Sequence, residues 1–173
     1  KRPQGGGSRY WRVLNDDDTC SFKDFRWVIK ELQFGDASSF HATPVEGGAI
    51  ADSEVPNAKA AWPFIGKSHW SSVGGAARPR GKAFLGYQFD SPVEVSRVRI
   101  VQFGGHDSSR MLVQSSDDGQ AWTTAWAVDL HRQGLGKFVP EVSSRPADAL
   151  STAIMAATGG ASAASGFFER NDG

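Results

Sequence analysis

The chain has 173 residues, a length that suits one domain, and its eleven Phe and six Trp can supply a substantial core. It carries 19 basic and 19 acidic residues, and this zero net charge argues against a general nucleic-acid binder. No apolar stretch approaches the roughly 18–20 residues needed to span a bilayer, so we expect a soluble protein without a transmembrane segment.

Cysteine content and the first residue bear on the compartment. Cys20 is the single cysteine, which excludes an intrachain disulfide. The chain begins at Lys1 with neither an initiator Met nor a signal sequence, so we expect a processed or partial chain. The expected location is extracellular, or in the lumen or on the surface of an organelle, rather than the cytosol.

The N-terminal part predicts an arm and two strands. Residues 1–8 are Gly-rich and are predicted to form the arm, and Tyr10–Leu14 is the first predicted strand. Phe25–Phe34 predicts a longer strand whose apolar face changes partway, and a bulge near Lys30-Glu31 would keep both apolar sets in the core. These two sets are Phe25, Trp27 and Ile29 on one side, and Leu32 and Phe34 on the other.

The middle of the chain predicts a loop-rich region followed by antiparallel strands. Residues 35–82 carry few strand signals and are predicted to be mostly loop. In residues 83–128 apolar positions alternate, Ser91-Pro92 breaks between two strands, and Ser116–Gly119 is typical of a hairpin turn. A second bulge is expected where Val93 and Val95 give way to Val98 and Ile100. The core aromatic residues are predicted to be Trp11, Trp27, Trp70 and Trp122.

The C-terminal residues 140–173 are predicted to be an extension of the domain. Arg145-Pro146 opens a short helix through Ala157, and a low-complexity Gly/Ala/Ser run follows it. Such a run needs a surface to lie on, because alone it cannot offset its ordering entropy. Two surfaces can hold the extension, the parent sandwich or a neighbouring subunit, and the small residues of the run favour the neighbour. The expected contacts are Leu150, Ile154, Phe167 and Phe168.

Five patches between about residue 9 and residue 130 resemble the discoidin or coagulation-factor C-type domain, one of the galactose-binding-like β-sandwiches. The resemblance implies an all-β, eight-stranded, jelly-roll-like antiparallel sandwich over residues 9–139 that binds ligands through loops at one end. It does not imply an enzyme, and fold alone does not determine function. The patches are Arg9–Val13, Glu31–Phe34, Ser68–Ser72, Leu85–Val95 and Val113–Trp122.

Two departures from the family pattern bear on the ligand. Members with a structural calcium usually place an Asp before a Gly in the loop that precedes the Trp70 position, and Trp62–Gly66 offers no carboxylate there. Galactose-binding members often carry a Pro-Arg pair where this chain has Gly104-Gly105-His106. Both departures count against a standard calcium-dependent lectin and against a galactose-specific one. We expect no cofactor, with a structural calcium as the alternative.

Loop residues with polar or aromatic side chains are the candidate ligand contacts. No acidic residue lies between Glu54 and Asp90, whereas five cations do, and such a cluster suits a sulfated glycan, a phospholipid headgroup or an acidic protein face as well as a solvated rim. The five cations are Lys59, Lys67, Arg78, Arg80 and Lys82, and the candidate ligand-binding residues are Trp62, His69, Arg78, Arg80, Lys82, His106 and Asp107.

Two functions from different classes follow, and neither is enzymatic. The first is a binding module that recognises a glycan or another surface through the loops at one end of the sandwich. The second is an accessory structural subunit of a larger assembly, held by its loops and its C-terminal tail. The missing calcium and Pro-Arg features count against the first function, and the composition of the tail favours the second.

Overall fold

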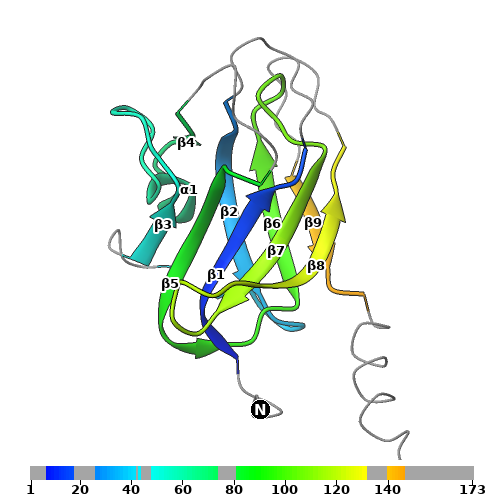
Figure 1. Ribbon diagram of the computed structural model, residues 1–173. Helices are drawn as coiled ribbons and strands as arrows, with labels where there is room; N and C mark the ends of the chain where they lie inside the picture. The colour runs from blue at the N-terminus through cyan, green and yellow to red at the C-terminus, as the bar shows by residue number, and fades with distance from the viewer. Residues whose placement is uncertain are drawn as a thin grey trace, which may run out of the picture.

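The computed structural model describes residues 7–17, 26–41, 43, 48–73, 81–131 and 140–146, which fold into two antiparallel sheets packed face to face (Figure 1). The five-stranded sheet has the order β3 (Ala49–Ala51), β5 (Phe84–Val93), β1 (Ser8–Asn15), β7 (Arg110–Ser116), β8 (Thr123–Asp129). The four-stranded sheet has the order β4 (Trp70–Ser71), β2 (Val28–Gly35), β6 (Arg97–Gln102), β9 (Pro140–Ser144).

The predicted all-β sandwich is confirmed. The described residues hold nine strands rather than the eight that the resemblance implies, and two of these, β3 and β4, have three residues or fewer. The one helix among them, α1 (Trp62–Ile65), is a single turn in the region predicted to be mostly loop. In the described segments no helix is long and apolar enough to cross a membrane.

The core forms where alternating apolar side chains of the two sheets meet. In β1, Trp11 and Val13 point inward while Arg12 lies on the outer face, as the period of two in a strand requires. Three of the four predicted core tryptophans, Trp11, Trp27 and Trp70, are buried. Trp27 and Trp70 pack edge to face, with ring centroids 6.1 Å apart.

The predicted bulge in β2 is confirmed. The β2–β6 ladder pairs Ile29 with Gln102 and then Glu31 with Val101, so one extra residue enters β2 between Ile29 and Glu31. Trp27 and Ile29 before the bulge and Leu32 and Phe34 after it are all fully buried. Lys30 and Glu31 both lie on the outer side of the sheet.

Two predictions for β5 and β6 were wrong. Ser91-Pro92 does not separate two strands, because β5 continues to Val93. An irregularity in the β1–β5 pairing, between Ser8 and Tyr10 of β1, accommodates these residues. The apolar pattern changes between Val95 and Val98 because the chain passes there from β5 in one sheet to β6 in the other. The change is therefore not a bulge within a strand.

Trp122 is not in the core, contrary to the sequence prediction. The β7–β8 pairing shifts by one residue beside Val113 and Gln114, so Ala125 is the extra residue and the face of β8 changes there. Trp126 consequently points into the core, and Trp122 lies half-buried on the outer face of the five-stranded sheet. Its ring centroid is 3.9 Å from the Arg12 guanidinium, and burial lowers the pKa of Arg12 to about 10.

Residues 140–144, assigned from the sequence to the C-terminal extension, form β9 and pair with β6. They extend the four-stranded sheet at the edge opposite β4. The helix predicted from Arg145 to Ala157 and the low-complexity tail lie almost entirely outside the described residues, as do Leu150, Ile154, Phe167 and Phe168.

Candidate ligand-binding pocket

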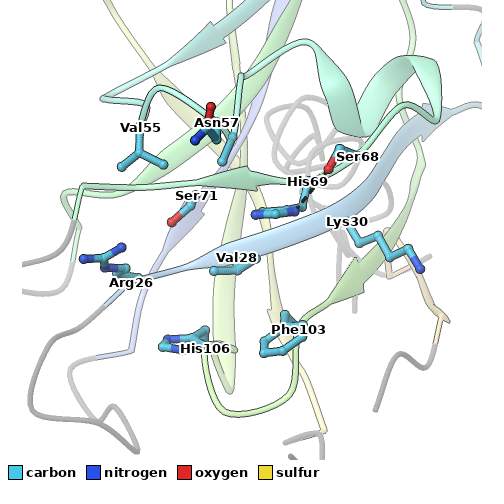
Figure 2. Close-up of a pocket in the computed structure, with 11 residues that line it drawn as sticks. Arg26, Val28, Lys30, Val55, Asn57, Ser68, His69, Ser71, Phe103 and His106 are labelled. Carbon is cyan, nitrogen blue, oxygen red and sulfur yellow. Dashed lines mark hydrogen bonds between the residues drawn. The ribbon is translucent and has the colours of Figure 1, made fainter. Parts of the chain in front are cut away.

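A pocket of about 450 Å³ lies on the outer face of the four-stranded sheet, close to the end of the sandwich where β2 begins (Figure 2). Its base is formed by the outward-facing residues of β2, including Val28 and Lys30. One wall comes from the segment 55–58 with Ser68, His69 and Ser71, and the other from the connection between β6 and β7. We call this the first pocket. Such a volume suits a small ligand or one unit of a larger one.

The β6–β7 connection is held against β2 by backbone hydrogen bonds. Val28 N donates to His106 O (2.9 Å), and Phe103 N donates to Val28 O (3.0 Å). Residues 103–106 form a turn in which His106 N donates to Phe103 O (2.9 Å). Gly105 has a φ of 94°, a conformation that glycine adopts without strain, and its N–H donates to Asp107 Oδ1 (3.1 Å). The turn therefore fixes where His106 and Phe103 face the pocket.

The opposite wall depends on Glu54. The carboxylate accepts a hydrogen bond from the backbone N–H of Ala60 (3.0 Å) and another from Lys59 Nζ (2.9 Å). These contacts, the Ala60 N–H first, lower the pKa of Glu54. Within the loop that they close, Ala58 N donates to Val55 O (3.0 Å), so the backbone that carries the wall residues is folded back on itself.

The lining of the first pocket combines positive charge, imidazoles and an apolar patch. Arg26 and Lys30 are cations, and His69 and His106 come from segments more than thirty residues apart. Figure 2 shows the two histidines on either side of Val28. The His106 ring stacks on Phe103, with centroids 5.9 Å apart. None of the described residues that line this pocket is acidic, so the lining favours a ligand with anionic or hydroxyl groups.

A buried polar network supports this end of the sandwich. Trp27 Nε1 donates to Gln102 Oε1 (2.6 Å), which also accepts from Ser108 N (2.9 Å), while Gln102 Nε2 donates to Ser108 O (3.1 Å). Ser108 Oγ in turn donates to Asn15 Oδ1 (2.6 Å), and Asn15 Nδ2 donates to Asp17 O (2.8 Å). The ends of β1, β2 and β6 are thus tied to the β6–β7 connection that carries His106.

The structure brings together two of the residues proposed from the sequence and separates others. His69 and His106 line the first pocket, whereas Lys82 and Trp62 do not. Asp107 is 1% exposed and does not line the first pocket; its carboxylate accepts the hydrogen bond from Gly105 N that supports the turn. Arg78 and Arg80 lie outside the described residues. Sequence reasoning missed Arg26, Lys30 and Asn57; for Lys30 alone a signal existed, since the predicted bulge places it on the outer face.

Comparison with known proteins finds no matching family model, no significantly similar curated protein and no significantly similar solved structure. The site must therefore be interpreted from its own residues. In the part of the chain that the structure describes, no group of three or more His, Cys, Asp or Glu side chains is arranged to hold a metal ion. The lining of the first pocket supplies hydrogen-bond donors and positive charge, which suit the binding of a ligand with anionic or hydroxyl groups.

Proposed function

We propose that this protein is a non-catalytic binding module of discoidin-like type that recognises a glycan. The observation that carries the proposal is the first pocket, in which His69 and His106 converge over Val28 beside Arg26 and Lys30. Imidazoles, an amide and hydroxyls can donate to and accept from sugar hydroxyls, and Phe103 offers an apolar surface for the C–H face of a sugar ring. The sequence resemblance to the discoidin domains supports a sugar over other small ligands.

The position of the pocket refines the sequence hypothesis. From the sequence we expected loops at one end of the sandwich to form the site. The first pocket is lined by one such loop, the β6–β7 connection, and by the adjacent outer face of the four-stranded sheet. A site that rests on strands is held more rigidly than one made only of loops. We therefore expect little rearrangement when the ligand binds.

A glycan array followed by titration calorimetry tests this function. His69→Ala and His106→Ala should each weaken binding by about tenfold, because each removes a side-chain hydrogen bond and part of a pocket wall. His131→Ala is the matched control, since its side chain is 94% exposed and it does not line the first pocket. Binding should persist in the presence of a chelator, because the segment Trp62–Gly66 lacks the family's calcium carboxylate. An array without hits at millimolar sugar, with and without calcium, would refute the proposal.

The alternative function, an accessory subunit of a larger assembly, has support from a different surface. β9 is an edge strand of the four-stranded sheet, and its Val142 is 59% exposed. Edge strands and exposed apolar side chains are common places for a partner to bind. Deletion of residues 158–173 tests the tail contact that this alternative also assumes: the alternative predicts an unchanged melting temperature of the isolated domain and reduced retention in a complex isolated from the native source.

A further inference from the structure

A second pocket of about 380 Å³ continues from the first along the outer face of β2. The two pockets share Lys30 and Ser68, and the second extends past Gln33 to Lys67 and the helix α1. The two pockets therefore adjoin at these residues, and we call the pair the β2 groove. From Val28 to Gln33 the strand β2 covers about 17 Å, since each residue advances the chain by about 3.3 Å. The groove is therefore long enough for more than one sugar unit.

Among the described residues that line the β2 groove, cations outnumber carboxylates. Arg26, Lys30 and Lys67 line it, and Glu31 is the one carboxylate among its described lining residues. Glu31 is itself matched by Arg99, whose Nε lies 3.5 Å from Glu31 Oε1. Lys67 stands at the far end, with Nζ 5.5 Å from the centroid of the Trp62 ring. A neutral sugar would use only part of these charges, whereas sulfate or carboxylate groups along a chain would meet each of them.

The groove runs over the face of a sheet, and this favours a glycan over an acidic peptide. An extended peptide gains much of its affinity by adding backbone hydrogen bonds to an open strand edge. The outer face of β2 presents side chains, because the backbone hydrogen bonds of a strand lie in the plane of its sheet, here to β6 along β2 and to β4 at Val28 and Ile29. Side-chain donors and cations suit a ligand whose polar groups project from a ring.

We propose that the ligand is an extended anionic glycan, sulfated or rich in uronic acid, that lies along the β2 groove across both pockets. This inference rests on the proposed glycan-binding function and specifies its ligand. It assigns Lys67 and Lys30 to ligand binding, in addition to the two histidines. It also gives Trp62 a role, as the aromatic surface that supports Lys67.

The test compares sulfated oligosaccharides of two and of six sugars with desulfated oligosaccharides of the same lengths, by calorimetry at low and at physiological salt. The sulfated hexasaccharide should bind at least tenfold more tightly than the sulfated disaccharide or the desulfated hexasaccharide. Of these ligands, its affinity should fall the most between low and physiological salt. Lys30→Gln and Lys67→Gln should each reduce its affinity about threefold to fivefold. Melting temperatures of both variants check that the fold is intact.

The binding measurements distinguish a failure of the anionic-glycan inference from a failure of the proposed glycan-binding function. If the desulfated sugars bind as well as the sulfated ones and His69→Ala weakens both, the module binds glycans but the anionic ligand is refuted. If Lys82→Gln weakens binding as much as Lys67→Gln, a diffuse basic rim is responsible and the groove is refuted. If a hexaglutamate peptide binds as tightly as the sulfated hexasaccharide, the choice of a glycan is wrong. If no sugar binds at all, the function itself fails.

Discussion

Replacing Gln102 by Met should destabilise the domain far more than the similar volumes of the two side chains suggest. Gln102 is 1% exposed, and its amide makes three hydrogen bonds, with Trp27 Nε1, Ser108 N and Ser108 O. In Gln102→Met these groups remain buried without that partner, and each such group costs about 1–3 kcal/mol. After the gain from burying a thioether, we expect the free energy of unfolding to fall by about 3–5 kcal/mol. For a chain of this size that is a loss of about 10 °C in melting temperature.

Gln114→Met is the matched control. Gln114 is 8% exposed; it accepts a hydrogen bond from Arg12 Nε (2.8 Å) and donates one to Thr124 Oγ1 (3.1 Å). Unlike the partners of Gln102, however, Thr124 is exposed and Arg12 is partly exposed, so water can take the place of the amide at both groups. Gln114→Met should therefore lower the free energy of unfolding by less than about 1.5 kcal/mol. Equilibrium urea unfolding, followed by tryptophan fluorescence, measures both variants. Equal losses for the two variants, or a loss below about 1 kcal/mol for Gln102→Met, would refute the argument.

Two further predictions concern other parts of the molecule. Trp126→Ala should lower the free energy of unfolding by about 3–5 kcal/mol, because it opens a cavity in the core. Trp122→Ala should lower it by about 1 kcal/mol, mainly through the lost contact with Arg12. Similar losses for the two variants in urea unfolding would contradict the assignment of Trp126 to the core and Trp122 to the outer face. The hydrogen bonds to Glu54 lower its pKa below the ordinary value of 4.5, so the stability it gives the pocket wall is present above pH 4.5 and is lost as the pH falls through the lowered pKa. The exchange protection of the Ala60 amide, measured by NMR, should decline over that range in the native protein but not in Glu54→Gln, and protection that persists below the range would contradict this.

Much of the sandwich could be predicted because its strands alternate strongly. Tyr10–Leu14, the hairpin at Ser116–Gly119 and the bulge before Glu31 all follow from local patterns of apolar and turn residues. Trp122 was misplaced for a definite reason. The register shift at Ala125 changes the face of β8, and an alanine between Thr124 and Trp126 gives no sign of a bulge.

The site was less predictable, because it depends on segments distant in the chain. His69 and His106 were proposed separately, and only the pairing of β2 with β4 and β6 brings them over the same residue, Val28. Arg26 lies beside a core tryptophan, and no local pattern marks it as a site residue. Asp107 looked like a ligand contact in the sequence, but its carboxylate is used by the turn next to it.

The bulge in β2 also determines where this protein can vary in length. Removing one residue from a strand usually turns every later side chain to the opposite face. In β2, deletion of Lys30 or Glu31 would instead restore a regular ladder with β6 and leave both Ile29 and Leu32 in the core. A family of such sandwiches could therefore gain or lose one residue here, and with it a charge on the floor of the β2 groove, while the core stays the same.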